Sequence, residues 1–310
     1  MKSPRTQNEA AEAFVSVLPY RLFEVRLLRK TVLSPHLCRL TFTGDDIDMM
    51  CTGAPDQRIK VFFPGADGKP PSLPLDDSWL GAYQAMPTGE RPPRRTYTIR
   101  ALRPGEMDID FVLHGETGPA SRWALHADPG ARIQLAAPNR AYDGDTGGYE
   151  WRPPTGAKRV LIIADETALP AVTGILEDLA ALDVRPLAEV YLEMPSTDDC
   201  VGLPDFPELN LEWLPRKPGD RHGAQMLSAA ARAHVPSDPA PDRADALPDI
   251  DVDTDILWDR ATTDRKDFYV WVAGEAHAVK EIRRILLKER GVDRKSANLM
   301  GYWRAGRVMD

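Results

Sequence analysis

The chain has 310 residues, of which 43% are hydrophobic and 28% charged, and its formal net charge is -8 at pH 7. This length exceeds what a single hydrophobic core usually organises, so two domains are expected. The negative balance disfavours nonspecific nucleic-acid binding, because a phosphate backbone demands a basic surface.

Targeting and metal-binding signals are missing from the sequence. No apolar run approaches the roughly 18 residues of a membrane span, and the N-terminus lacks the apolar core of a secretory signal. Cys38, Cys51 and Cys200 are widely separated, without CxxC spacing, which argues against disulfides and zinc sites. The six histidines form no HExxH motif. We therefore expect a cytoplasmic protein with no protein-bound metal and no membrane contact.

Residues 20–150 carry six short β-rich segments separated by Gly, Pro and Asp. These segments are "RLFEVRLLRKTVL", "LCRLTFTG", "RIKVFFPG", "RTYTIRAL", "MDIDFVLHG" and "ARIQLAAP". Strands at this spacing predict an antiparallel six-stranded barrel, closed or nearly closed, with little helix.

Residues 151–310 alternate apolar strands with amphipathic helices. "RVLIIAD" is typical of a parallel strand covered on both faces, and "ETALPAVTGILEDLAAL" follows it with helical spacing. The later segments are "PLAEVYLEM", "LNLEWLP", "GAQMLSAAARAH", "DFYVWVAG" and "AHAVKEIRRILLKERG". The pattern predicts an open α/β nucleotide-binding domain, so the fold class is a β domain followed by an α/β domain.

The tract from Pro236 to Arg265 is rich in Pro and Asp and has no clear periodicity. It predicts a mobile surface insertion that need not pack, with a functional lid as the alternative.

The segment "RRTYTIR" concentrates hydrogen-bond donors on one predicted strand. Alternation places Arg95, Tyr97 and Ile99 on one face and Thr96, Thr98 and Arg100 on the other. Such a strand can hold a flat, anionic ligand such as a flavin dinucleotide, because the ring contacts apolar atoms while guanidinium and hydroxyl groups bind phosphate. Taken alone, it fits an exposed edge strand equally well.

A second segment, "HGETGPAS", leads from a strand into a helix expected to begin near Ser121. Gly115, Gly118 and Pro119 shape the turn, and free amides at a helix start attract pyrophosphate. Ser121 also suits an N-cap, which is compatible with phosphate binding.

These two segments, followed in order by "ADETALPAV", "WVAGEAHAVKEIRR" and "GYWRAG", resemble the siderophore-interacting protein family. Its members are FAD-dependent ferric-siderophore reductases of the ferredoxin-reductase-like superfamily. The resemblance begins near Tyr20 and leaves out the Pro236 to Arg265 tract. It implies an FAD-binding barrel and a second domain that accepts NADH or NADPH.

The resemblance also implies which residues bind the cofactors. The FAD set is Arg95, Thr96, Tyr97, Thr98, Asp110, Val112, His114, Ala120, Ser121, Trp123, Asp165, Thr167, Ala168 and Trp303. Within this set Tyr97 is expected against the flavin ring. The nicotinamide is expected at Gly274 and Glu275, although Glu275 suits the complementing of a helix dipole almost as well.

The second domain lacks GxGxxG, the usual dinucleotide fingerprint. The family instead uses a strand-end turn, here Asp165 to Pro170, at the edge where open sheets bind ligands. Arg216 and Lys217 follow a later strand and suit the 2'-phosphate of NADPH, although a solvated basic turn is the preferred account.

The implied reaction reduces the Fe(III) of a siderophore with electrons from NAD(P)H, and Fe(II) is then released in the cytoplasm. Lys60 and Arg304 are the candidates for binding an anionic siderophore, and solvated surface charges are the alternative. A reductase with another acceptor, a binding protein without FAD, and a ferredoxin-fed relative remain open. No heptad pattern demands a partner, so a monomer is expected.

Overall fold

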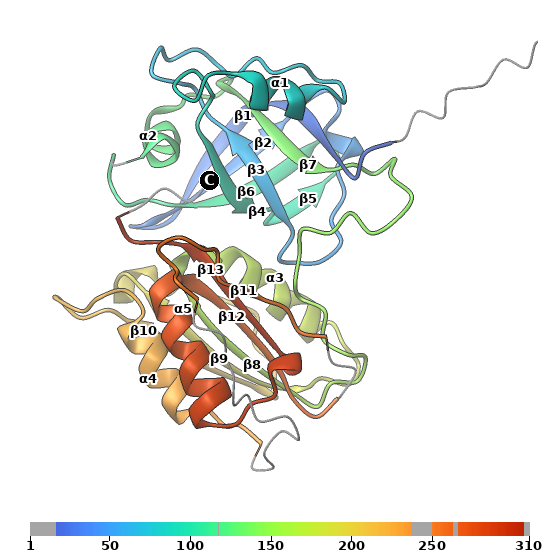
Figure 1. The fold of residues 1–310 in the computed structure, drawn as a ribbon. Helices are drawn as coiled ribbons and strands as arrows, with labels where there is room; N and C mark the ends of the chain where they lie inside the picture. Colours follow the sequence, from blue (N-terminus) through green and yellow to red (C-terminus); the bar gives the residue numbers. More distant parts are fainter. Residues whose placement is uncertain (1–16, 117, 237–249, 263–265, 307–310) are drawn as a thin grey trace, which may run out of the picture.

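The computed structural model describes residues 17–116, 118–236, 250–262 and 266–306. Two sheets divide these residues between an N-terminal β half and a C-terminal α/β half (Figure 1). This arrangement confirms the predicted fold class. Within the described ranges, no helix is both long and apolar enough to cross a membrane.

The first sheet is curled and antiparallel, with strand order β4-β3-β7-β1-β2-β6-β5. Its strands are β1 (Tyr20–Ser34), β2 (Leu37–Thr43), β3 (Arg58–Phe62), β4 (Arg94–Thr98), β5 (Ala101–Arg103), β6 (Glu106–Val112) and β7 (Arg132–Pro138). The prediction of six strands is wrong by one, because "RTYTIRAL" forms both β4 and β5. Between them the N–H of Arg100 donates to the carbonyl of Asp108 on β6, at 2.9 Å. This bond connects the β4 end of the sheet to β6, and the sheet curls toward closure.

Alternation along the strands fills the barrel interior. Met107, Ile109 and Phe111 of β6 are fully buried in one core, and the carboxylates of Asp108 and Asp110 lie on the other face of the strand. The expectation of little helix in this half missed α1 (Trp79–Ala85). The helix expected to begin near Ser121 is α2 (Pro119–His126), which begins two residues earlier.

The second sheet has the order β10-β9-β8-β12-β13-β11. Its strands are β8 (Arg159–Asp165), β9 (Leu187–Met194), β10 (Leu209–Pro215), β11 (Trp258–Asp259), β12 (Tyr269–Glu275) and β13 (Ala297–Trp303). All pair in parallel except β11, which is antiparallel to β13. The order of the strands reverses between β8 and β12, and ligands of open α/β sheets bind at the carboxyl end of such a reversal.

Helices cover both faces of this sheet. One face packs against α3 (Leu169–Ala180), and the other packs against α4 (Ala224–Arg232) and α5 (Ala276–Arg283), which continues as a π-helix over Arg284–Glu289. The continuous apolar run of β8 is explained by this double cover, because Leu161 and Ile163 face α4 and α5 while Val160 and Ile162 face α3.

Part of the predicted surface insertion is built into the second domain. Val252 and Leu257 are 5% and 1% exposed and belong to the core beneath α4 and α5. Asp259 of β11 accepts hydrogen bonds from Arg283 at 2.6 Å and Arg294 at 2.7 Å. The prediction that the tract need not pack is therefore wrong for residues 250–262. Residues 237–249 and 263–265 lie outside the described residues.

The barrel lies against the second domain (Figure 1). Leu37 and Val112 of the barrel join the hydrophobic cluster formed with α3. Arg100 donates to both carboxylate oxygens of Glu177 on α3, at 3.0 and 2.5 Å. Apolar and charged contacts thus hold the two halves together.

Candidate functional site

The β4 segment presents an arginine and an aromatic ring. Arg95 donates to the carbonyl of Arg94 at 2.6 Å, and no carboxylate pairs with it in the described part of the chain. The Tyr97 ring packs against Phe111, with centroids 4.3 Å apart, and its edge meets Phe63. Burial raises the pKa of the Tyr97 phenol, so it stays neutral. An unpaired guanidinium next to a half-buried ring fits an anionic aromatic ligand.

Thr96 and Thr98 of β4 pair in register with residues of β3. Lys60 of β3 lies opposite Thr96 in the register and donates to its hydroxyl at 2.6 Å. Thr98 is 6% exposed and lies opposite Arg58. The predicted substrate residue Lys60 and the predicted cofactor residue Thr96 are therefore in direct contact.

Among the described residues, no side chain caps the start of helix α2. Gly118 precedes it in extended conformation, and Ser121 lies 3.3 Å from the Nε2 atom of His114 instead of capping the helix. The N-cap interpretation of Ser121 is therefore wrong. A Cβ atom at Gly115 or Gly118 would meet no other atom within 4 Å, so this turn has free space. Gly115 has φ +75, a left-handed conformation that favours glycine.

Four other predicted cofactor residues of the barrel have partners within the fold. Asp110 is held by Arg39 through bonds of 2.7 and 2.8 Å, and Val112 packs against the second domain. Trp123 stacks on Phe42 at 6.0 Å, and Ala120 is buried in the barrel core. These side chains support β6 and α2 from behind.

In the second domain, Asp165 joins three strand ends. Its Oδ1 accepts from the backbone N–H of Thr167 at 3.0 Å and from the hydroxyl of the same residue at 2.5 Å. Its Oδ2 accepts from the N–H of Glu275 at 2.9 Å and from the indole of Trp303 at 2.7 Å. Burial and the neighbouring charge of Glu166 raise the pKa of Asp165 to about 7. The carboxylate thus fixes the Trp303 indole at the switch point of the sheet.

The predicted nicotinamide residues lie beside Asp165. A Cβ atom at Gly274 would lie 2.7 Å from Asp165 Oδ2, so glycine is needed for this close approach. Glu275 caps α5 by accepting from the N–H of Ala278 at 3.0 Å, and it also accepts from the N–H of Ala305 at 3.2 Å. Ala168 is fully buried. Cap and packing roles therefore account for these side chains in this structure.

A buried ion-pair cluster lies at the same edge. Arg216 donates to both oxygens of Glu166, each at 2.7 Å, and to Glu193 at 3.2 Å. The preferred account of Arg216 as part of a solvated basic turn is wrong, because its side chain is only 11% exposed. Sequence reasoning missed Glu193, although both β8 and β9 carry acidic residues where their apolar runs end.

The structure does not present Arg304 as an exposed cation. It is 8% exposed, donates to the carbonyl of Val252 at 2.5 Å and pairs with Asp253 at 3.4 Å. The long side chain secures the 250–259 segment, which the sequence pattern had treated as an unpacked insertion.

The barrel residues fit a dinucleotide that carries a flat ring. Within the described ranges, the start of α2 has no side-chain cap and Arg95 has no carboxylate partner, so both can offer donors to a pyrophosphate, and a Cβ at Gly118 would meet no atom within 4 Å. Among the described residues, no group of three or more His, Cys, Asp or Glu side chains is placed to hold a metal ion.

Two family models match this chain. Residues 26–142 match the model described as the siderophore-interacting FAD-binding domain, and residues 157–306 match the model of the siderophore-interacting protein. The chain belongs to the siderophore-interacting protein family. Membership confirms the resemblance of the motifs, and FAD is the cofactor of the first of these two domains.

Curated relatives of this family member cover nearly its whole length. An uncharacterized protein of Mycobacterium tuberculosis is 34% identical, with 94% of this chain and 92% of the relative covered. Ferric vibriobactin reductase ViuB of Vibrio cholerae is 28% identical, covering 90% and 88%. The NADPH-dependent ferric-chelate reductase of Escherichia coli is 26% identical, covering 92% and 94%.

A solved structure shares the fold. The siderophore utilization protein from T. fusca superposes with a TM-score of 0.70 at 25% identity, covering 94% of this chain and 96% of that one.

Proposed function

We propose that this chain reduces the Fe(III) of a ferric siderophore to Fe(II) through FAD, with NADPH or NADH as the electron donor. Two features of the described residues carry the proposal. The barrel combines Arg95, which has no carboxylate partner, with a helix start that has no side-chain cap, and the second sheet contributes its switch point. The names of the V. cholerae and E. coli relatives support the substrate class and the donor.

FAD supplies the chemistry that links two-electron hydride transfer to one-electron reduction of iron. In the proposed complex, Arg95 and the first turn of α2 bind the pyrophosphate, because both offer donors to an anion. Tyr97 and Thr98 hold the ring, and Trp303, fixed by Asp165, closes the site from the second domain. The nicotinamide binds beside Gly274 at the carboxyl edge of the sheet.

Lys60 is the proposed contact for an anionic ferric siderophore, because its amino group is bonded to the hydroxyl of Thr96, the residue between Arg95 and Tyr97 on β4. Strand alternation puts this amino group on the face of β4 opposite the side chains of Arg95 and Tyr97, so the siderophore would bind on that face. Arg304 was the second candidate, and it now has the structural partners Val252 and Asp253. We therefore retain Lys60 as the substrate residue. No general base is assigned, since electron transfer needs none.

We further propose a domain boundary near residue 150, a monomeric state and a cytoplasmic location. Reduction weakens the binding of iron by oxygen donors, so iron release follows from the reaction, and we place that release in the cytoplasm as part of the proposal. A ferric-chelate reductase with a different acceptor is the second candidate, and the name of the E. coli relative favours it.

Stopped-flow absorbance tests the proposal. Purified protein is loaded with FAD and mixed with NADPH, NADH or reduced ferredoxin, and then with a ferric siderophore or ferric citrate while an Fe(II)-specific dye records product. We expect bleaching by a nicotinamide and faster dye formation with the siderophore. Protein that neither binds FAD nor gains its yellow absorbance refutes the proposal, and equal rates with citrate favour the second candidate.

Two substitutions assign the residues. Arg95→Ala should weaken FAD binding by about 10- to 100-fold, the equivalent of losing one charge-assisted hydrogen bond of roughly 1.5–3 kcal/mol. Arg140→Ala, a change at an exposed arginine whose guanidinium donates to the Met50 carbonyl, serves as the matched control. Lys60→Ala should raise the half-saturation concentration for the siderophore and leave NAD(P)H oxidation by a neutral acceptor unchanged. Equal losses in both assays would remove Lys60 from the substrate site.

A further inference from the structure

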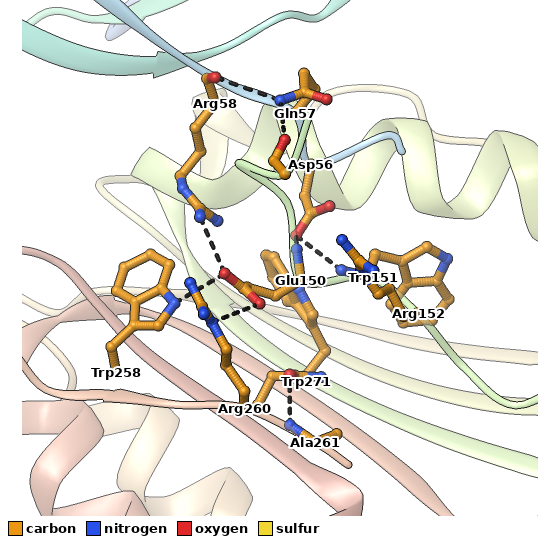
Figure 2. A network of polar contacts seen from close by, with 12 residues as sticks. Asp56, Gln57, Arg58, Glu150, Trp151, Arg152, Trp258, Arg260, Ala261 and Trp271 are labelled. Carbon is orange, nitrogen blue, oxygen red and sulfur yellow. Dashed lines mark hydrogen bonds and ion pairs between the residues drawn. The ribbon is translucent and has the colours of Figure 1, made fainter. Parts of the chain in front are cut away.

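A buried polar network connects the barrel, the segment between the domains and the second sheet (Figure 2). Asp56 and Arg58 come from the barrel, Glu150 and Trp151 lie in the connection, and Trp258, Arg260 and Trp271 come from the second domain. None of these residues belongs to the FAD or substrate set assigned above.

Glu150 is the centre of this network. The residue is only 6% exposed. Its Oε1 atom accepts hydrogen bonds from the guanidinium of Arg58 and the indole of Trp258, both at 3.0 Å. Its Oε2 pairs with Nε of Arg260 at 3.1 Å. One carboxylate is therefore bonded to donors from both domains. The Arg58 guanidinium also lies 4.4 Å from the centre of the Trp258 ring, a cation–π contact.

Asp56 fixes the peptide that carries Glu150. It is fully buried, and its Oδ2 accepts from the backbone N–H groups of Glu150 at 2.9 Å and Trp151 at 3.0 Å, and from the Trp271 indole at 3.3 Å. Burial raises the pKa of Asp56. The barrel loop is thus bonded both to the connection and to β12.

The two ends of the network reach the two halves of the proposed site. On the barrel side, Arg58 pairs with Thr98 in the register of β3 and β4. On the other side, Trp258 stacks on Tyr302 with ring centres 5.9 Å apart and planes inclined by 10°. Tyr302 directly precedes Trp303, whose indole is bonded to Asp165. A continuous set of bonds and packed rings therefore runs from the flavin-binding strand to the nicotinamide edge.

We propose that Glu150 is a positioning residue that sets the distance between strand β4 and the carboxyl edge of the second sheet. The proposal rests on the proposed function, since its consequence is the geometry of hydride transfer between a ring on β4 and a nicotinamide on the second sheet. Hydride transfer needs reacting atoms within roughly 3–3.5 Å, and a displacement of about 1 Å can cost about 100-fold in rate. A contact far from the chemistry can thus control the rate without touching either cofactor.

The test compares Glu150→Ala and Glu150→Gln with Glu177→Gln. Glu177 also bridges the domains through Arg100, but its carboxylate is 48% exposed, so it is the matched control. We expect Glu150→Ala to lower the limiting rate of flavin reduction by about 10- to 100-fold, while the affinities for FAD and NADPH and the rate of reoxidation by a ferric chelate stay within about twofold. Glu150→Gln keeps an acceptor for Arg58 and Trp258 and should recover part of the rate.

Hydrogen exchange of the FAD-free protein gives a readout that does not depend on activity. In Glu150→Ala, exchange should increase at residues 56–58, 150–152 and 258–260, while the β6 and β8 cores stay protected. Unchanged exchange at these segments, or equal losses in reduction and reoxidation, would overturn the proposal. If Glu150→Ala does not fold, Arg260→Ala removes one donor and is expected to show the same split more weakly. Failure of the wild type to react with NAD(P)H would refute the proposed function alone, and the exchange pattern would still decide whether Glu150 joins the domains.

Discussion

Removal of Arg216 tests whether the charged cluster at the end of β8 and β9 stabilises the second domain. Arg216 is 11% exposed, and the carboxylates of its partners Glu166 and Glu193 are 6% and 0% exposed. Arg216→Ala leaves both carboxylates in place. Breaking a buried pair from one side costs about 3–5 kcal/mol, because an uncompensated charge remains.

The structure divides this cost unequally between the two carboxylates. Glu193 keeps three backbone donors at the start of α4, the N–H groups of Gly223, Gln225 and Met226, at 2.7, 2.9 and 3.2 Å. Glu166 loses its ion-pair partner. We therefore expect the lower end of the range, about 3 kcal/mol, which for a domain of this size is a fall in melting temperature of about 6–12 °C.

Urea unfolding followed by circular dichroism measures the change, with Arg232→Ala as the matched control. Arg232 pairs with Glu212 at 2.5 Å, but the two side chains are 40% and 49% exposed, so its removal should cost at most about 1 kcal/mol. Adding Glu166→Gln to Arg216→Ala should recover at least about 1 kcal/mol, because the unpaired charge is removed. A cost for Arg216→Ala equal to that of Arg232→Ala would refute the reasoning.

Three further predictions concern the stability contributed by Gly274, Asp165 and Asp199. Gly274→Ala should destabilise the protein by about 1–3 kcal/mol, because the added Cβ lies 2.7 Å from Asp165 Oδ2, whereas Gly202→Ala, with no atom within 4 Å, should stay within about 0.5 kcal/mol in thermal unfolding. The pKa of Asp165 is raised to about 7, so its contribution to stability is fully present below pH 3.8 and is lost as the pH rises through about 7; the cost of Asp165→Asn should accordingly shrink between pH 5 and pH 8, and a cost independent of pH would contradict this. Burial raises the pKa of Asp199, but hydrogen bonds from both domains outweigh burial and lower its pKa overall. The contribution of Asp199 to folding stability is therefore present above pH 3.8 and is lost as the pH falls below that value. Asp199→Asn should cost about 2 kcal/mol at pH 7 and less in acid, as urea titrations at the two pH values would show.

Local pattern predicted the elements well where burial repeats along the chain. The bounds of β8 and β10 coincide with "RVLIIAD" and "LNLEWLP". The strand β8 is buried on both faces and is continuously apolar, whereas the edge strand β10 alternates half-buried apolar residues with the exposed Asn210 and Glu212. The tract from Pro236 to Arg265 was misjudged for the opposite reason. Val252 stands alone between two aspartates, and Leu257 lies in a run of only three apolar residues, so neither gives a clear periodic signal, and only distant helices give them a core to join.

Some residues of the candidate site could likewise be predicted from the sequence, and others could not. Arg95, Tyr97 and the turn before α2 lie within short segments whose composition already indicates a phosphate and a ring. The role of Glu275 at the start of α5 was one of the alternatives read from the sequence, because its partner Ala278 is only three residues away. The role of Arg304 was decided by Val252, 52 residues away, so spacing carried no signal of it. Glu150 had no motif at all, and its importance comes from three donors that meet only when both domains are folded.

The amino-acid sequence by itself determined the family, the order of a β and an α/β domain, and the strand on which we propose that an arginine and a tyrosine meet the flavin, because these depend on neighbouring residues. Only the tertiary structure decided which charged side chains form ion pairs with each other and how the domains are joined. A carboxylate or guanidinium is available to a ligand only when no buried partner has taken it, and residues such as Arg58, Glu150 and Arg260 become partners through folding alone.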